Sequence, residues 1–337
     1  MTNGPSLRAR VAIVVCAAVL LAAAATGYVL RAGSRGPGPV AAAGDAGAGP
    51  SWTGDGRVWV LSNGVLSSVA ARDPAGPRVI SGRRCDRAHA AHGTVACLLP
   101  VDALRRTRLD VLSRGPRGRR SVPLTGFPNR LRVSDSGRMV AWTLFVGGHS
   151  YAAGGFSTSA GILDTRTGET VRSLEEFAVT LGGRPYRSAD VNVWGVTFTR
   201  DDNRFYATLS TGGRRYLVEG DFSARTLRTV ADGVECPSLS PDGTRVAFKA
   251  AAGGDPARGW RLSVLDLATR EVVASAEARS VDDQAIWLDD RTLAYGLQRS
   301  DGVNDVWTVP ADGTGRPRVL VPQANSPALD AEAGPPG

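Results

Sequence analysis

One motif recurs four times in this sequence and constrains its fold more than any other feature. Each copy has an apolar segment, a turn rich in Asp, Asn or Gly, and then a run that alternates apolar with polar residues. The copies are RVSDSGRMVAWTLF from Arg132, VTFTRDDNRFYATLS from Val196, PSLSPDGTRVAFKA from Pro237 and AIWLDDRTLAYGLQ from Ala285. Such turn residues satisfy backbone groups or accept positive φ, and the alternation is typical of a half-buried strand. The motif therefore predicts repeated β-hairpins.

A second hairpin follows several of these copies, as in WRLSVLDLATREVVASA from Trp260. Four strands that recur every 40 to 50 residues or so are typical of a propeller blade. The segment 52–321 holds 270 residues, which suits six blades. We expect an all-β, six-bladed β-propeller, whose first two blades, from Trp52 and about Arg83, are assigned by spacing alone. The turn residues expected to be structural are Asp135, Gly137, Asp201, Asp202, Asp242, Gly243, Asp289 and Asp290.

The repeat also resembles a known family. SLSPDGTRVAF followed by LSVLDLAT is similar to the repeat of TolB-like propellers. CDRAHAAHGTVACLL, NVWGVTFTRDDNRFYATL and VECPSLSPDGTR together resemble the membrane-tethered TolB-like proteins of actinobacteria. The resemblance covers roughly 52–321 and specifies the fold more strongly than the function. In better-known members an α/β domain precedes the propeller and a peptidoglycan-associated lipoprotein binds it. We expect this chain to lack that domain, so the partner does not carry over.

The segment 11–30 is an uncharged apolar run of 20 residues. At about 1.5 Å per residue, a helix of this length spans a bilayer of roughly 30 Å. We expect a single transmembrane signal-anchor, with a cleaved signal peptide as the alternative. Lipid attachment at Cys16 is disfavoured, because bulky Val15 precedes it. The other predicted segments are a short cytoplasmic end at 1–10, a flexible Gly/Pro/Ala linker at 31–51, the propeller at 52–321 and a disordered tail at 322–337.

The spacing of the cysteines indicates the cellular compartment in which the propeller lies. Cys85 and Cys97 flank a short segment that contains His and Gly, which suits a hairpin closed by a disulfide. Disulfides persist in oxidising compartments, so we expect the propeller to lie outside the cytoplasm, held at the cell membrane by a single pass. Two buried thiols are the alternative. Cys236 would remain as an unpaired, buried side chain.

Enzymatic and metal sites find little support in the sequence. It contains three histidines, His89, His92 and His149, and no GxSxG motif, which argues against a serine hydrolase. His89 and His92 lie between the two cysteines, where we expect a surface loop. The paired acids of the repeat turns do not match an EF-hand loop. We therefore expect no metal and no cofactor.

Binding residues are expected on one face of the propeller. The loops before the innermost strands and between the second and third strands should open together, and long loops on a rigid scaffold commonly bind ligands. The candidates are His149, Tyr151, Phe156, Tyr186, Arg187, Asp190, Glu235, Arg258, Asp282, Asp283 and Asp301. Four of them are expected to form an acidic funnel for a cation or a cationic segment: Asp190, Glu235, Asp282 and Asp283. Solvated turn acids are the alternative.

The net charge is +8, and every basic residue except Lys249 is arginine. This bias is a property of the composition and does not by itself indicate recognition. A basic patch, opposed by Asp110 alone, consists of Arg105, Arg106, Arg108, Arg114, Arg117, Arg119 and Arg120. Outside the cytoplasm it would meet anionic lipid headgroups or wall polymers and no nucleic acid. An ordinary solvated hairpin is the alternative.

These features predict a non-catalytic protein-binding or scaffolding module at the cell envelope. The partner would be an envelope protein or a wall component, whose identity the sequence does not give. A second hypothesis is a propeller-type glycan-active hydrolase or lyase, with Asp190 and Asp282 as acid and base. A third is a sensor that reports through the short cytoplasmic end.

Overall fold

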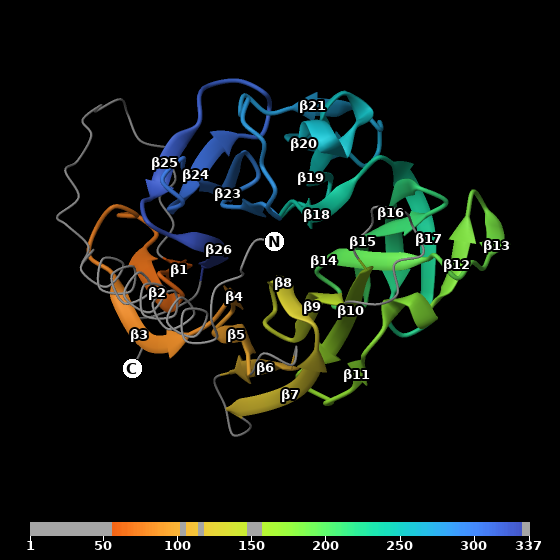
Figure 1. The fold of residues 1–337 in the computed structure, drawn as a ribbon, viewed down its shortest axis with the longest axis horizontal. Coiled ribbons are helices and arrows are strands. Elements are labelled where there is room, and N and C mark those ends of the chain that lie inside the picture. Colours follow the sequence, from red (N-terminus) through yellow and green to blue (C-terminus); the bar gives the residue numbers. More distant parts are fainter. Residues whose placement is uncertain (1–55, 102–105, 114–117, 147–156, 332–337) are drawn as a thin grey trace, which may run out of the picture. The chain divides into compact units, whose positions relative to one another are not determined.

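The computed structural model describes residues 56–101, 106–113, 118–146 and 157–331. Six β-sheets surround an axis in this part of the chain (Figure 1). It contains no α-helix, only the short 3-10 helices η1 (Leu174–Glu176), η2 (Ala252–Gly254) and η3 (Pro256–Arg258). The predicted all-β, six-bladed propeller is therefore confirmed.

The predicted membrane anchor, cytoplasmic end and linker lie outside the described residues. Within the described residues, no helix has the length and apolar character needed to cross a membrane.

The first three blades have four strands each. Blade 1 consists of β26 (Asn325–Asp330), β1 (Arg57–Ser62), β2 (Val65–Ala70) and β3 (Val79–Arg84). Blade 2 consists of β4 (Arg87–Ala91), β5 (Thr94–Pro100), β6 (Arg106–Leu112) and β7 (Arg119–Thr125). Blade 3 consists of β8 (Phe127–Val133), β9 (Met139–Val146), β10 (Ser157–Asp164) and β11 (Thr170–Val171). Each order runs outward from the axis.

The last three blades follow the same plan, with one addition. Blade 4 consists of β14 (Asn192–Phe198), β15 (Arg204–Thr211), β16 (Arg214–Asp221) and β17 (Thr226–Asp232), extended by β12 (Ala178–Leu181) and β13 (Arg184–Tyr186). Blade 5 consists of β18 (Glu235–Leu239), β19 (Arg245–Ala251), β20 (Trp260–Asp266) and β21 (Val272–Ala274). Blade 6 consists of β22 (Ile286–Trp287), β23 (Thr292–Gln298), β24 (Asn304–Pro310) and β25 (Arg318–Val321).

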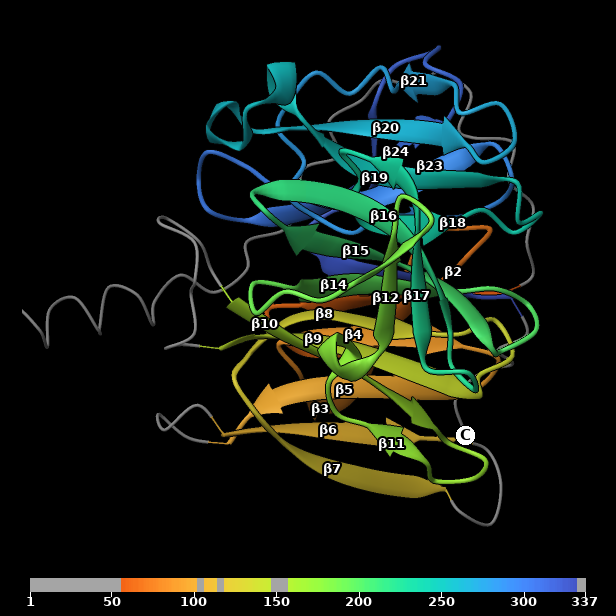
Figure 2. The same cartoon turned by 90° about the vertical axis from the view of Figure 1, so that its right-hand side faces the viewer.

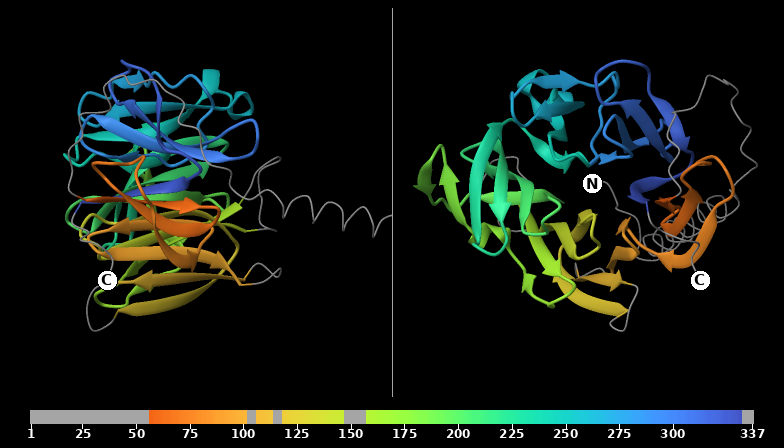
Figure 3. Two further views of the ribbon diagram at one scale, coloured as in Figure 1. Left: turned by 90° about the vertical axis from the view of Figure 1, so that its left-hand side faces the viewer. Right: turned by 180° about the vertical axis from the view of Figure 1, so that it is seen from behind.

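The first strand of each blade lies at the axis. In ring order these inner strands are β26, β4, β8, β14, β18 and β22, and each contacts the next. The strands run lengthwise between two faces of the propeller (Figures 2 and 3). We call the face where the inner strands begin the loop face. The face where they end, in the turns to the second strands, is the turn face.

Strand β26 completes the first blade. Val58 of β1 pairs antiparallel with Leu329, and Trp59 pairs with Ala328. The disordered tail predicted at 322–337 is therefore wrong for this part of the segment. Its Pro- and Ala-rich composition suggested no core, but Ala328 is fully buried. Its partner strand lies at the other end of the propeller sequence, where no local pattern could indicate the pairing.

Apolar side chains fill the space between neighbouring blades. Trp142 of β9 packs with Leu109 of β6 and Leu163 of β10 in one such cluster. Gly161 lies against the Trp142 ring, where an added Cβ would stand 2.3 Å from Cζ2. Since interiors are close-packed, glycine at this position makes room for the indole.

Strands β12 and β13 form a hairpin outside β17. Its first strand pairs parallel to β17, with Val179 beside Leu227. Tyr186, a candidate expected in the open loops of one face, therefore belongs to a β-strand. The hairpin extends the sheet of blade 4 beyond β17, so that β13 forms its outer edge.

Candidate functional site

The repeat turns lie together on the turn face, where their acids bind backbone groups. The Asp242 carboxylate accepts hydrogen bonds from the Thr244 amide (3.0 Å) and the Ser240 hydroxyl (2.5 Å). Although burial opposes it, this bonding lowers the pKa of Asp242 to about 2. Asp201 binds the amides of Asn203 and Arg204 in the same way.

The remaining turn residues have similar structural contacts. Gly137 and Gly243 have φ of 76° and 75°, in the region that glycine adopts without strain. Asp289 accepts from the Arg291 amide and Asp290 from the Asp242 amide. Asp202 accepts from the Ser136 hydroxyl, and Asp135 is an exposed residue of the β8–β9 turn.

Three residues predicted for the loop face, His149, Tyr151 and Phe156, lie outside the described residues. The other candidates lie in or beside the connections that open on this face. The structure brings only some of them together.

Asp282 is the centre of a charge cluster in which its exposed carboxylate meets two buried cations. Its carboxylate accepts from Lys249 Nζ at 2.5 Å and from an Arg130 Nη at 3.3 Å. Lys249, the single lysine of the chain, also lies over the Trp260 ring, 4.3 Å from its centroid. Burial raises the pKa of Asp282, but Lys249 and Arg130 outweigh it and hold the pKa below its ordinary value. The Asp282 carboxylate is therefore paired with cations of the protein, although it is itself exposed.

Glu235 lies beside this cluster and is only 4% exposed. Arg215 Nε stands 3.2 Å from its carboxylate. Burial raises the pKa of Glu235 above its ordinary value, and Asp282 adds to the shift against the opposing effect of Lys249 and Arg215. Each of these two carboxylates has a cationic partner, so together they do not form the acidic funnel expected for a cation.

The other predicted residues are bound locally. Asp190 accepts from the Ser188 and Thr211 hydroxyls, both at 2.6 Å, and from the Gly212 amide. These bonds lower its pKa. Asp283 accepts from the Gly296 amide at 2.8 Å.

Tyr186 shares a hydrogen bond with the Thr211 hydroxyl, and Asp301 is paired with Arg299 at 3.1 Å. Arg187 and Arg258 are exposed. The predicted residues that the structure describes are therefore mostly polar side chains held in place, together with the exposed Arg187 and Arg258.

The axis holds polar residues that sequence reasoning missed. Arg132 Nη2 donates to the Ala285 carbonyl at 3.1 Å, and the Gln284 amide donates to the carbonyls of Val196 (3.1 Å) and Pro237 (2.8 Å). These bonds connect blade 3 with blade 6, and blade 6 with blades 4 and 5. The polar positions of inner strands such as NRLRV gave the only sequence signal.

His89 is a further correction. It was expected in a surface loop, but it belongs to inner strand β4 and is 8% exposed. Its neighbour in the sequence, His92, occupies the β4–β5 turn with φ of 47°. Burial, reinforced by Arg132, lowers the pKa of His89 well below its ordinary value, so the imidazole is neutral.

Two cavities open along the axis. The larger, about 350 Å³, lies at the turn face and is lined by every inner strand. We call it the axial pocket, and its inner-strand residues include His89, Arg132, Thr197, Ser238, Ile286 and Leu329. A space of about 30 Å³ lies nearer the loop face, among Arg87, Arg130, Asp283 and Gln284.

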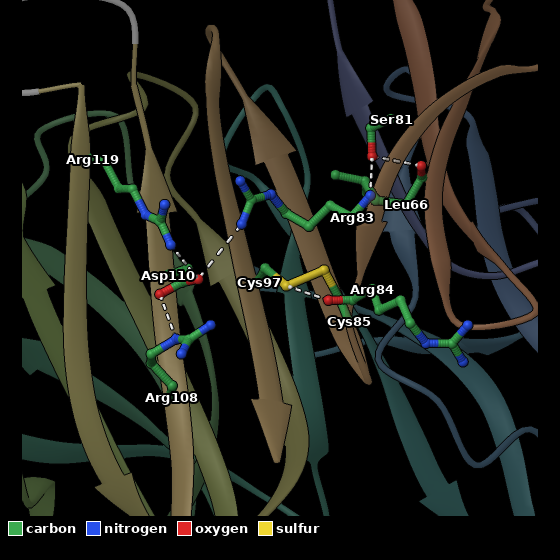
Figure 4. The surroundings of a disulfide bond; sticks show 9 residues. All are labelled: Leu66, Ser81, Arg83, Arg84, Cys85, Cys97, Arg108, Asp110 and Arg119. Atoms are coloured by element: carbon green, nitrogen blue, oxygen red, sulfur yellow. Dashed lines mark hydrogen bonds and ion pairs between the residues drawn. A yellow bond between two sulfur atoms is a disulfide. The ribbon is translucent and has the colours of Figure 1, made fainter. Parts of the chain in front are cut away.

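The predicted disulfide between Cys85 and Cys97 is present, with Cα atoms 5.5 Å apart (Figure 4). It joins the segment before β4 to β5. Cys236 is buried and forms no disulfide with any described cysteine.

The basic patch has an internal counter-charge. Asp110 is fully buried, and its carboxylate lies 2.9 Å from Arg108, 3.5 Å from Arg83 and 3.6 Å from Arg119 (Figure 4). Arg106 and Arg120 belong to the same two strands, β6 and β7. The other predicted members, Arg105, Arg114 and Arg117, lie outside the described residues. Within the described part of the chain, no group of three or more His, Cys, Asp or Glu side chains could hold a metal ion.

Several solved structures share this fold. TolB from Acinetobacter baumannii has a TM-score of 0.59 and 15% identity, over 83% of this chain and 68% of that one. A putative TolB from Agrobacterium tumefaciens has a TM-score of 0.49 and 13% identity, over 80% of this chain and 89% of that one. A chain of a nidogen/laminin complex has a TM-score of 0.52 and 10% identity, over 82% of this chain and 97% of that one.

No protein-family model and no curated protein matches the sequence. The family resemblance of the repeats and the similarity of the folded structures nevertheless agree. By its fold, the described part of this chain is a TolB-like six-bladed β-propeller.

Proposed function

We propose that this chain is a non-catalytic protein-binding module of the cell envelope. Residues 11–30 would anchor it in the membrane, and residues 31–51 would tether the propeller outside the cytoplasm. The buried Cys85–Cys97 disulfide supports an oxidising compartment.

One observation carries the choice of a binder over an enzyme. The Asp190 carboxylate is bound by two hydroxyls and an amide, while Asp282 is bound by Lys249 and Arg130. A catalytic acid and base need protons that they can exchange with a substrate. The contacts lower the pKa of both carboxylates of the predicted catalytic pair, so neither is suited to hold the proton that a catalytic acid donates. The similar propeller in the nidogen/laminin complex also supports a role in protein binding.

Crosslinking in intact cells followed by pulldown of the full chain tests this function. We expect recovery of an envelope protein by the wild type and reduced recovery by an Arg187→Glu/Arg258→Glu variant of the loop face. An Arg291→Glu/Arg316→Glu variant makes the same charge change at exposed positions of other connections and should recover the partner normally. Recovery of only cytoplasmic proteins, or equal loss in both variants, would contradict the proposal.

A second candidate function rests on Glu235. Burial raises its pKa, whereas the pKa of nearby Asp282 is lowered, and two carboxylates with separated pKa values suit a glycan hydrolase or lyase. Assays of the purified chain on wall glycans test this alternative. Product formation that a Glu235→Gln variant abolishes would establish it over the binder.

A further inference from the structure

The floor of the axial pocket carries a positive charge without a paired carboxylate. Arg132 lines the pocket and is 8% exposed. It forms no ion pair with any described residue, and its buried Nε has no hydrogen-bond partner there. Asp283 and Asp135 act on it only at longer range, and burial lowers the pKa of Arg132 to about 10. A buried cation is costly unless it is paired.

At the floor of the axial pocket, His89 and Arg132 also lack a hydrogen-bond acceptor between them. The Val133 amide donates to Nδ1 of His89 at 3.2 Å. A neutral imidazole carries one hydrogen, so this contact places that hydrogen on Nε2. Nε2 lies 3.1 Å from Arg132 Nη1, which is itself only a donor. Two donors therefore face each other at the pocket floor.

The walls and the mouth restrict what can reach this floor. Leu239, Ile286, Trp287 and Leu329 give the pocket apolar walls. At the mouth, Asp135 is attracted by Arg132 more strongly than by the exposed Arg200. The lining as a whole keeps a net positive charge, because its charged residues are Arg132, Arg200, Arg204, Asp135 and Glu219. A volume of about 350 Å³ is near the lower end of ligand pockets.

We propose that the axial pocket binds a carboxylate group, which accepts hydrogen bonds from Arg132 and His89 at the pocket floor. The apolar walls favour the free C-terminus of an apolar peptide segment as the source of that carboxylate. This inference rests on the proposed binding function and assigns it a ligand chemistry. It places the site on the turn face, opposite the loops predicted from the sequence.

Calorimetry on the full chain in detergent tests the proposal. The probes are the peptide acetyl-Ala-Leu-Leu-Ala with a free C-terminal carboxylate, the same peptide with a C-terminal amide, and sodium acetate. We expect the amide to bind at least about tenfold more weakly than the acid, since charge-assisted hydrogen bonds to arginine are lost. Equal binding of acid and amide, or no binding of either peptide or of acetate, would overturn the proposal.

Acetate separates the two sources of the carboxylate. If acetate displaces the peptide at equal concentration, the ligand is a free small carboxylate and the chemistry of the site stands. If the peptide binds much more tightly, the apolar walls contribute and a peptide end is the ligand. The crosslinking result does not depend on either outcome, so failure here leaves the envelope-binding function to its own test.

Variants locate the binding. Arg132→Gln should weaken the acid peptide about tenfold, and Arg200→Glu about threefold through the field at the mouth. Arg291→Glu alters the charge equally at an exposed position outside the pocket lining and should bind as the wild type does. If Arg132→Gln does not fold, Arg200→Glu decides. Wild-type affinity in the folded pocket variants would place the carboxylate elsewhere and end the proposal.

Discussion

Arg132 and Ala285 face each other across the propeller axis, joined by a hydrogen bond of 3.1 Å from the guanidinium to the backbone carbonyl. Their strands, β8 and β22, belong to opposite blades of the ring. With the bonds of Gln284, this contact connects the inner strands directly, in addition to the apolar packing between neighbouring blades.

Replacing Gln284 with alanine should therefore destabilise the ring. The change leaves the carbonyls of Val196 and Pro237 without their donor in a buried place, which costs about 2 kcal/mol of unfolding free energy. Denaturant unfolding measures the loss. Gln298→Ala removes an amide that bonds the Gly302 carbonyl at the exposed surface and should change stability by less than about 0.5 kcal/mol. Equal losses of unfolding free energy in the two variants would show that the hydrogen bonds of Gln284 at the axis do not stabilise the protein.

A charged residue introduced into β26 should disrupt its pairing with β1 and destabilise the first blade. Ala328 is fully buried opposite Trp59, so Ala328→Glu buries an unpaired carboxylate at a cost of about 3 kcal/mol or more. Ala224→Glu introduces the same residue at an exposed turn and should leave thermal unfolding almost unchanged. An Ala328→Glu protein that melts with the wild type would refute the closing role of β26.

Loss of the disulfide should lower stability by roughly 3 kcal/mol, because the crosslink restricts the unfolded chain over a separation of 12 residues. Denaturant unfolding of the wild type with and without reductant gives the difference. A Cys85→Ser/Cys97→Ser variant serves as the control and should not respond to reductant. A response of that variant would trace the loss to something other than this bond.

Lowering the pH should remove the contribution that the Asp164 carboxylate makes to the free energy of unfolding. Burial raises the pKa of Asp164, but Arg138 and the amides of Arg166 and Thr167 lower it to about 2. A carboxyl with a lowered folded-state pKa stabilises the protein above its unfolded pKa, and this stability is lost as the pH falls through the folded value. Between about pH 4 and pH 2, the wild type should therefore lose stability that Asp164→Asn already lacks at pH 7.

Unfolding curves across that pH range provide the measurement. Asp232→Asn is the comparison, because Asp232 pairs with Arg214 at the exposed surface and such pairs contribute little. The gap between the wild type and Asp164→Asn should narrow as the pH falls. A gap that stays constant would show that the Asp164 charge is not its source.

The repeats could be predicted from the sequence because their information is local. The turn around Asp242 and Gly243 contains the residues that it needs within one hairpin. The Cys85–Cys97 pair also lies within a single short segment. Such features can be predicted from a short segment, without reference to distant parts of the chain.

The axial site could not be predicted in the same way. Arg130 and Arg132 alternate with apolar residues in β8, so they read as the solvent side of a half-buried strand. That side faces the axis, where six inner strands meet and leave Arg130 and Arg132 buried. Lys249 and Asp282 come together from different blades for the same reason, and only the closed ring makes them neighbours.

Because β26 completes the first blade, it also determines when that blade can finish folding during synthesis. The first sheet stays one strand short until Asn325–Asp330 has been synthesised, because Val58 pairs with Leu329 of that strand. A premature stop or a protease cut just before this strand would remove residues that are distant in sequence from the first blade and would still leave that blade incomplete.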